Sequence, residues 1–356
     1  MSAVSHAAMS SAAKRTTATR MRPSVPGIEA GIAPMRRTPR LREVDRVLDD
    51  ATNARPDPNV PRRLGAAVAQ KRVLCATDLS PRSQRAVGRA TLLANRLDAQ
   101  LLLLHVIEPD QIIDQSLHAR EQIAQQLRST GLSAAHEPSI ELRAGAYIQT
   151  IAAVAKETHA DLIVLGSQRR KPLAPLIGTT AERITELSGR PVLIVNLDPQ
   201  EPYGAVLMAA ELSDAFIRVV RFAALLRFLD AESVSVVHGF ESPYRGPLCA
   251  EGFDTGAATR YMEEWERAAG ASLLRKLDAA GVESSRFRLV FQQSRPIRAV
   301  QRVVRSIQPD LLIVGTKERS MLSRVMRGSV ANDVLRRIEC DILVASPGIE
   351  SAGVLY

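Results

Sequence analysis

Residues 161–166 read DLIVLG, and residues 310–315 read DLLIVG. Each run is almost wholly apolar between an acid and a glycine, which is typical of a strand buried on both faces of a parallel sheet. Segments of helical period, such as 81–97 and 146–159, separate the first run from four similar ones. These further strands are RVLCAT (72–77), QLLLLHVI (100–107), IELRA (140–144) and PVLIVN (191–196). The alternation predicts an α/β fold in which helices cover both faces of a parallel sheet.

The second half of the chain repeats the plan of the first half at matched intervals. These are 27 residues for Asp78–His105 and Glu211–His238, 16 for Gly145–Asp161 and Ser294–Asp310, and 13 for Gly178–Pro191 and Gly328–Asp341. Self-similarity of this kind indicates a duplicated structural unit. We therefore predict two tandem open-sheet domains, over residues 70–199 and 203–348, each built on a five-stranded parallel sheet with helices on both faces.

The positive charge of the chain is concentrated at its start. The formal net charge is +9 over 356 residues, and residues 1–70 carry 12 Lys and Arg against 6 Asp and Glu. This stretch has no sustained apolar period, so it cannot bury enough surface to offset the entropy of ordering it. We expect residues 1–69 to form a disordered basic tail and linker, with a short helix over 41–54 as its one candidate element.

The composition favours a cytoplasmic protein. No apolar run approaches the roughly 20 residues that cross a bilayer, and the start lacks the apolar stretch of a signal peptide. Its Arg-rich, acid-poor character also resembles a transit peptide, which is the less favoured interpretation. Cys75, Cys249 and Cys340 are too few for a disulfide framework, and two of them lie beside apolar runs, as small buried hydrophobes do in a reducing compartment.

The turn after the first strand of each copy is one half of a candidate binding site. It reads CATDLSPRS (75–83) in the first copy and MAAELSDAF (208–216) in the second. Ser80 followed by Pro81 is a favourable helix start. In open α/β sheets, ligands bind at the carboxyl ends of the strands where the winding reverses, and this turn lies at that edge.

The loop after the fourth strand is the other half. It reads GSQRRKPLAPLIGTTAERI (166–184) in the first copy and GTKERSMLSRVMRGSVANDV (315–334) in the second. A glycine followed by Thr or Ser at a helix start offers free amide hydrogens, a hydroxyl and the positive end of the helix dipole to an anion. The same pattern is also an ordinary capping device, and the loops by themselves do not separate the two interpretations.

The remaining candidate residues are better explained by structural roles than by metal binding, catalysis or cofactor binding. His105 and His238 share one register, but no further ligand recurs beside them at metal-binding spacing, so strand-end roles are favoured. Thr77 and Ser80 have no histidine base within the motif, so a hydrolase triad is unsupported. The charges at 169–171 are expected to be solvated, with a phosphate or RNA contact as the less favoured interpretation. Tyr261 and Trp265 lie on one helix face, where packing or partner contact is favoured over a cofactor site.

Together these motifs resemble the universal stress protein family in its tandem form, an adenine nucleotide alpha hydrolase-like fold. The resemblance covers about residues 70–348 and is carried by DLIVLG, GTTAERI and PVLIV in order. Nucleotide-binding members carry Gly, two residues, Gly, nine residues, then Gly with Ser or Thr. The resemblance implies ATP contacts at Thr77, Asp78, Val106, Gly166, Arg169, Gly178 and Thr179, and in the second copy at Glu211, Gly239, Gly315, Gly328 and Ser329.

Both loops depart from the family pattern. The middle glycine is Arg169 in the first copy, where only eight residues precede Gly178, and Glu318 in the second. Arginine can contact phosphate, although its Cβ restricts the backbone. Glutamate repels a triphosphate, and Glu211 extends a longer acid toward the ribose. ATP, an adenine nucleotide, is therefore expected in the first copy rather than the second.

The resemblance implies a stress-response binding or regulatory module and not an enzyme, with an unidentified regulatory protein as partner. Pairing through the last strands, 191–196 and 342–346, is expected to join the two copies, and a homodimer is a further option. One alternative is a nucleotide-free interaction and dimerisation module of the same family. Another is a nucleic-acid-associated protein that uses its basic tail, although nucleic acid is not the favoured partner. An ATP pyrophosphatase is disfavoured because residues 76–83 hold no Ser-Gly-Gly loop.

Overall fold

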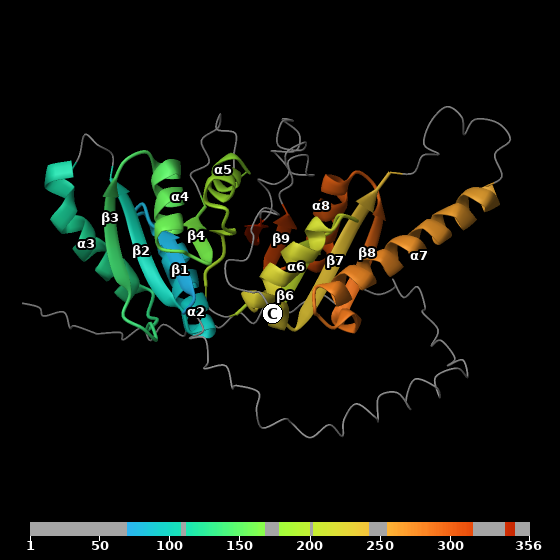
Figure 1. Cartoon of the computed structure of the whole chain (residues 1–356), viewed down its shortest axis with the longest axis horizontal. Helices are drawn as coiled ribbons and strands as arrows, with labels where there is room; N and C mark the ends of the chain where they lie inside the picture. The colour runs from blue at the N-terminus through green and yellow to red at the C-terminus, as the bar shows by residue number, and fades with distance from the viewer. Residues whose placement is uncertain are drawn as a thin grey trace, which may run out of the picture. The chain divides into compact units, whose positions relative to one another are not determined.

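Two α/β repeats make up the part of the chain that the structure describes (Figure 1). The structure is a computed structural model that describes residues 70–107, 112–167, 178–199, 202–241, 255–315 and 339–345. The expected basic tail, the helix expected over 41–54 and Cys249 lie outside these residues. None of the helices in the described ranges is both long and apolar enough to span a membrane.

The first repeat follows the predicted order of strands and helices. Its first strand begins at Arg72, and the helix expected over 81–97 is present with those bounds. The elements are β1 (Arg72–Ala76), α2 (Pro81–Leu97), β2 (Gln100–Ile107), α3 (Ile112–Ser129), β3 (Ser139–Ala144), α4 (Tyr147–Glu157), β4 (Leu162–Gly166), α5 (Gly178–Ser188) and β5 (Val192–Val195).

The second repeat has the same plan with a longer helix before its third strand. This helix, α7, contains Tyr261 and Trp265, as expected. The elements are β6 (Ala205–Ala209), α6 (Ala215–Leu225), the 3-10 turn η2 (Phe228–Asp230), β7 (Ser233–Phe240), α7 (Thr255–Ala279), the 3-10 turn η4 (Ser284–Arg286), β8 (Phe287–Gln293), α8 (Pro296–Ile307), β9 (Leu311–Gly315) and β10 (Asp341–Ala345).

The five strands of each repeat are parallel, as predicted, and the two sets join into one sheet. The strand order is β3-β2-β1-β4-β5-β10-β9-β6-β7-β8. Among the strands that the structure describes, the only antiparallel pair is β5 with β10, where Leu193 lies opposite Leu343. These two leucines are equivalent positions of the repeats, so the pairing has approximate two-fold symmetry. The prediction that the last strands join the copies is confirmed.

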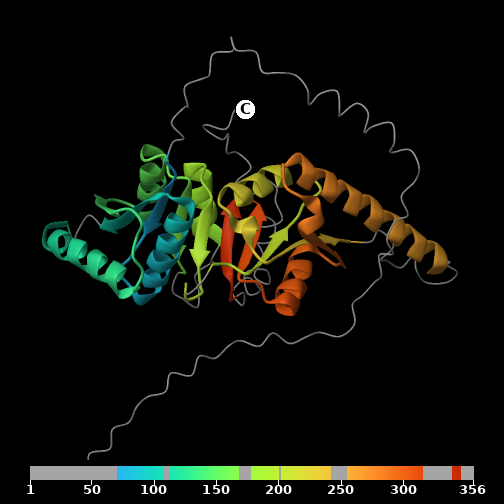
Figure 2. The same cartoon turned by 90° about the horizontal axis from the view of Figure 1, so that it is seen from below.

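Helices cover both faces of the sheet, and each face has its own apolar core (Figure 2). One core lies under α2, α6 and α7, with contributions from α3. The other lies under α4, α5 and α8. Cys75 and Cys340 are free and buried in these cores, as the sequence indicated. Burial raises the pKa of the Cys340 thiol to about 12, with a smaller contribution from Asp341, so this sulfur is inert.

The first helix of repeat 1 shows why the sequence folds as it does. Ser80 accepts a hydrogen bond from the amide of Ser83, and Pro81 occupies the first helical position. At the other end, Asp98 adopts a left-handed conformation and its amide bonds to the carbonyl oxygens of Ala94 and Asn95. Both helix ends are therefore satisfied, and substitution of such an N-cap by alanine typically costs about 1 kcal/mol.

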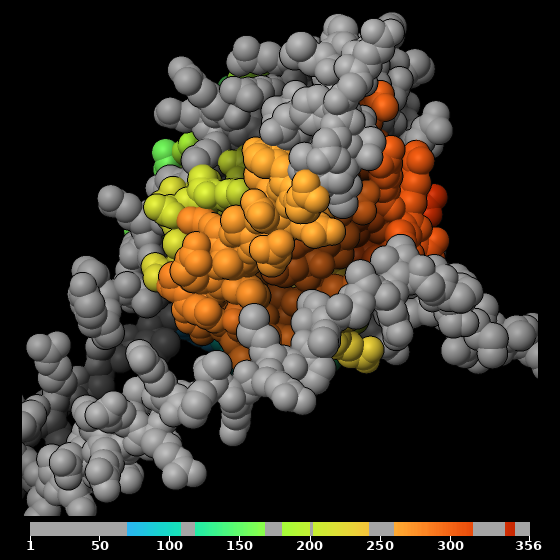
Figure 3. Space-filling model, turned by 90° about the vertical axis from the view of Figure 1, so that its right-hand side faces the viewer, coloured from blue at the N-terminus to red at the C-terminus, as the bar shows by residue number. Residues whose placement is uncertain are grey.

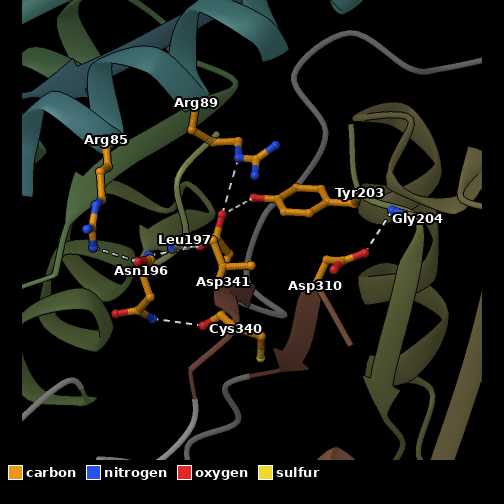
Figure 4. Close-up of polar contacts among 9 residues, drawn as sticks. All are labelled: Arg85, Arg89, Asn196, Leu197, Tyr203, Gly204, Asp310, Cys340 and Asp341. Atoms are coloured by element: carbon orange, nitrogen blue, oxygen red, sulfur yellow. Dashed lines mark hydrogen bonds and ion pairs between the residues drawn. The ribbon is translucent and has the colours of Figure 1, made fainter. Parts of the chain in front are cut away.

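A buried polar cluster lies where β5 meets β10 (Figure 4). Asp341 is fully buried and accepts hydrogen bonds from the amides of Asn196 (2.8 Å) and Leu197 (2.9 Å) and from the hydroxyl of Tyr203 (2.6 Å). The Nε of Arg89, on α2, lies 3.3 Å from the same carboxylate. The Arg89 guanidinium also lies over the Tyr203 ring, 4.2 Å from its centroid.

This cluster distinguishes the two repeats at equivalent positions. Arg89 belongs to repeat 1, whereas Tyr203 and Asp341 belong to repeat 2, and repeat 1 has Pro191 where repeat 2 has Asp341. The acid before the fourth strand does not differ, because Asp310 accepts hydrogen bonds from the amides of Gly204 (2.9 Å) and Ala205 (2.8 Å) as Asp161 does from the amide of Arg72 (2.8 Å), so the difference lies in Arg89, Tyr203 and Asp341. The symmetric strand pair is therefore held by an asymmetric set of charges.

Candidate functional site

The carboxyl ends of β1 and β4 form the point in repeat 1 where the winding of the sheet reverses. These strands are neighbours, β2 and β3 lie beyond β1, and β5 lies beyond β4. Thr77 and Asp78 follow β1, and Gly166 ends β4. Continuing the β1–β2 register beyond its last pair, Ala76 with Leu104, brings Asp78 beside Val106. Four of the predicted site residues are thus brought to one edge of the sheet.

Thr77 anchors this edge through a buried network. Its hydroxyl lies 2.7 Å from Oε1 of Gln126, on α3, and 2.9 Å from the hydroxyl of Ser83. It also accepts a hydrogen bond from the amide of Leu79 (3.0 Å). The Gln126 amide nitrogen in turn donates to the carbonyl oxygen of Ser80 (3.0 Å). Because these groups are paired with one another, the Thr77 side chain holds the turn in place.

Asp78 is the group that the turn presents to solvent. Its Oδ1 accepts a hydrogen bond from the amide of Ser80 (3.0 Å), and the intervening Leu79 has a φ of 63°. Partial burial acts to raise the pKa of Asp78, but hydrogen bonds from Ser80 and Ser83 outweigh it, so the pKa lies below its ordinary value. The turn therefore offers a charged acceptor at the reversal point.

The two strand-end histidines have matching structural roles. His105 places Nδ1 2.8 Å from the carbonyl oxygen of Thr77, and His238 places Nδ1 2.8 Å from that of Ala210. Each ring thereby ties the end of one strand to the turn after its neighbour. No group of three or more metal-ligating side chains lies within the described parts of the chain. The favoured structural interpretation of these histidines is confirmed by their hydrogen bonds.

Gly166 lets the loop after β4 leave the sheet close to the start of α2. A Cβ on this glycine would lie 3.0 Å from the Cα of Ser83 and 3.1 Å from the carbonyl oxygen of Arg82. A larger residue would therefore push the two segments apart. Gly178 opens α5, which begins where the phosphate interpretation requires a helix N-terminus.

Several predicted site residues lie outside the described residues. These are Arg169 in the first loop and Gly328 and Ser329 in the second, together with Glu318. The backbone of Thr179 lies in the first turn of α5. The structure thus describes the strand-one half of the predicted site and leaves the phosphate half as a prediction.

Tyr147 is a site neighbour that the motif analysis did not single out. It is the first residue of α4, and burial, followed by the charge of Asp78, raises the pKa of its phenol. The ring therefore lies close enough to Asp78 for the two to interact electrostatically. The signal in the sequence was its isolation, because it is the sole aromatic residue before position 200.

The equivalent edge of repeat 2 is built differently. Glu211 follows β6, but Ser213, which corresponds to Ser80, makes no side-chain hydrogen bond within the described residues, and α6 starts at Ala215 without a side-chain cap. Gly239 occupies the position of Val106. A Cβ there would lie 2.7 Å from the Cβ of Ala299 and 2.7 Å from the Cα of Pro296. The start of α8 therefore occupies the space that a side chain at this position would need.

Gly315 ends β9 as Gly166 ends β4. A Cβ on Gly315 would lie 3.0 Å from a side-chain carbon of Val219, so here the tight approach involves a side chain instead of a helix backbone. Trp265 packs against the ring of Phe240, with centroids 4.0 Å apart, and stacks on His238 at 5.7 Å. As expected, Trp265 is a packing residue.

Both repeats match one known protein family. The model of the universal stress protein family matches residues 70–196 and again residues 202–346. The chain belongs to the universal stress protein family. It is a tandem member, because the two matches coincide with the two repeats of the sheet.

Two relatives illustrate this membership. Universal stress protein A homolog 1 of Coxiella burnetii is 28% identical over 137 residues, which are 35% of this chain and 95% of that protein. A functionally unknown protein from Pseudomonas aeruginosa, PA1789, has a solved structure that covers 78% of this chain and 93% of its own, with 19% identity and a TM-score of 0.51. At this identity, the similarity to PA1789 concerns the fold alone.

Proposed function

We propose that this universal stress protein is a regulatory binding module that takes one adenine nucleotide, ATP, in repeat 1. The observation that carries the proposal is the turn after β1, where Asp78 is held as an exposed, charged acceptor at the reversal point of the sheet. Ligands of open α/β folds bind at this point. A carboxylate there can accept hydrogen bonds from a ribose hydroxyl or an exocyclic amine.

The neighbouring groups suit the two ends of a nucleotide. Val106 is partly buried at the end of β2 and offers an apolar wall for a base. Gly178 opens α5, so the first amides of this helix and its positive dipole end are available to phosphate. The resemblance of the motifs to those of nucleotide-binding family members supports the same arrangement.

Repeat 2 is proposed to leave its equivalent site empty. The start of α8 fills the space beside Gly239, and the turn after β6 lacks the serine cap that fixes the turn in repeat 1. Glu211 also places a longer acid at the reversal point. These three differences favour one nucleotide per chain.

We propose binding without turnover. Nδ1 of His105 is engaged by the backbone of Thr77, and the Thr77 hydroxyl is engaged by Gln126. Neither group is therefore arranged as a base and nucleophile pair. A regulatory protein partner and a cytoplasmic location belong to the same proposal. Binding without turnover predicts that incubation with ATP releases no ADP above the buffer background.

The proposal is tested by identifying and titrating the ligand of the full chain. Mass spectrometry of small molecules released from freshly purified protein should detect an adenine nucleotide, and calorimetric titration with ATP should give one site per chain. Asp78→Ala should abolish binding, whereas the matched variant Glu211→Ala should retain it. Equal loss in both variants, or retention in Asp78→Ala, would refute the assignment to repeat 1.

The alternative of a nucleotide-free module gives a different result in the same experiment. Neither retained nucleotide nor heat of ATP binding would then be seen, although the two repeats would still pair. That pairing uses β5 and β10 within one chain, which leaves β3 and β8 as the edge strands of the described sheet. We therefore expect a monomer in light scattering, since the pairing strands are already occupied.

A further inference from the structure

A stripe of arginines runs along the outer side of α8. Its members are separated by three, four and three residues, which places them on one side of a helix with 3.6 residues per turn. All are exposed, while Ala299, Val300 and Val303 on the opposite side are buried in the core. The stripe consists of Arg295, Arg298, Arg302 and Arg305.

The edge strand β8 adds a fifth arginine to the same face of the sheet. Side chains alternate between the two faces of a strand. Phe287 and Leu289 pack in the core under α7, and Val290 packs in the core under α8. Arg288, two residues before Val290, therefore lies on the α8 side, where it is exposed. Figure 3 looks onto this end of repeat 2, with α7 in orange and the region of α8 in deeper orange-red.

This positive charge is hardly compensated. The chain has no acidic residue between Glu283 and Asp310. Arg295 pairs with Glu241, whose Oε1 lies 3.0 Å from Nε. Within the described residues, no carboxylate pairs with the remaining four arginines. We call these four the α8 arginine surface: Arg288, Arg298, Arg302 and Arg305.

The equivalent surface of repeat 1 is neutral, so the charge is not a requirement of the fold. The positions that match Arg298, Arg302 and Arg305 are Gln149, Ala153 and Lys156 on α4, and Ser139 on β3 matches Arg288. Arg143 does lie on this side of β3, but two acidic residues neutralise its charge. Its partners are Glu141, on the same strand, and Glu157, whose Oε2 lies 2.9 Å from Nη2 of Arg143.

The surroundings of the α8 arginine surface select among anionic partners. Insertion into a bilayer and tight protein docking both rely on exposed apolar or aromatic anchors. The large exposed apolar side chains of the described residues lie elsewhere: Leu187, Leu212, Leu225, Tyr261 and Leu274. Stacking of single-stranded bases would likewise need an exposed aromatic ring. Guanidinium groups without such anchors suit phosphate oxygens, which they bind bidentately.

We propose that the α8 arginine surface binds the phosphodiester backbone of duplex nucleic acid, without reading its sequence. This surface of repeat 2 is separate from the proposed nucleotide site, which lies in repeat 1. The magnitude follows from counterion release, since each neutralised phosphate contributes about 0.9 to the slope of log K against log salt. Four contacts give a slope of about −3.6 from this surface, and roughly a hundredfold loss of affinity between 50 and 200 mM salt.

The test uses fluorescence anisotropy of labelled duplexes of mixed sequence, with a DNA arm and an RNA arm. In the full chain, Arg298→Gln with Arg302→Gln should weaken binding of the preferred duplex roughly tenfold per arginine at low salt and make the slope about 1.8 less steep. The matched control, Arg143→Gln with Lys156→Gln, removes two positive charges from the equivalent surface of repeat 1. It should leave the affinity and the slope close to those of the wild type.

Residues 1–69 are present in every variant, so any contribution of this basic segment cancels in the comparison. If both double variants keep the wild-type slope, binding lies elsewhere in the chain and the proposal is wrong. It is equally overturned if the wild type binds neither duplex at low salt, or binds vesicles with anionic headgroups but no duplex. Arg302→Glu alone, checked for folding by circular dichroism, should reproduce the loss from a single exposed position.

Discussion

The buried Asp341 offers the sharpest test of how the two repeats are held together. Asp341→Asn keeps the size of the side chain and an oxygen for the amides of Asn196 and Leu197, but it removes the charge opposite Arg89. Burial acts to raise the pKa of Asp341, and Arg89 is the strongest of the groups that oppose this effect. The two groups therefore interact, and the substitution removes the Asp341 charge from beside a buried guanidinium.

The expected cost is large because neither partner can reach solvent. Asp341 is fully buried and Arg89 is 3% exposed. Removing one member of a buried pair typically costs about 3–5 kcal/mol, which is a substantial part of the roughly 5–15 kcal/mol that stabilises an ordinary domain. In a unit of this size, such a loss lowers Tm by roughly 10 °C.

Urea unfolding, followed by circular dichroism and by the fluorescence of Trp265, measures this loss. The matched control is Asp310→Asn, which also removes a carboxylate that accepts two backbone amides but has no arginine facing it in the described residues. It should cost about 1–2 kcal/mol. Arg89→Met combined with Asp341→Asn should be less destabilised than the sum of the single variants by about 0.5–3 kcal/mol.

Two outcomes would show that Asp341 and Arg89 do not stabilise the fold as a charge pair. One is a loss below about 1 kcal/mol in Asp341→Asn, which would mean that Arg89 finds other compensation. The other is additivity of Arg89→Met and Asp341→Asn within about 0.5 kcal/mol, since residues that do not interact add in this way.

Three further predictions concern individual side chains. Thr77→Val removes the hydroxyl that pairs with Oε1 of Gln126 and with the amide of Leu79 and should cost about 1–3 kcal/mol in urea unfolding; an unchanged midpoint would contradict its anchoring role. Gly239→Ala places a Cβ 2.7 Å from that of Ala299, so overpacking should cost about 1–3 kcal/mol, and a neutral result would show that α8 can move away. Burial, with help from the charge of Glu186, raises the pKa of Glu182 from 4.5 to about 7; because the folded pKa is the higher one, stability present below pH 4.5 is lost as pH rises through about 7. Glu182→Gln should therefore raise Tm relative to the wild type more at pH 8 than at pH 5, and a constant difference would argue against the raised pKa.

The strand-one half of the candidate site was accessible from sequence, and its supporting network was not. The CATDLSPRS motif identified Asp78 and the Ser80 cap, because both are local features of a turn and a helix start. Gln126 lies 49 residues from Thr77 in the sequence, and no local pattern indicates their contact. No local pattern indicates the role of Gly239 either, because that role depends on how closely α8 approaches β7.

The charged residues show most clearly which features follow from local sequence and which depend on the fold. The two repeats, their parallel strands, their family and a second domain that is close to neutral overall could all be predicted from the sequence, because periodicity and composition are local properties of a chain. Which charges meet could not be predicted in this way, because it depends on the fold. Folding buries Asp341 against Arg89 and collects Arg288 with the arginines of α8 on one face, since Coulomb interactions depend on distances that chain folding creates. A net charge near zero therefore conceals both an internal ion pair and a basic surface.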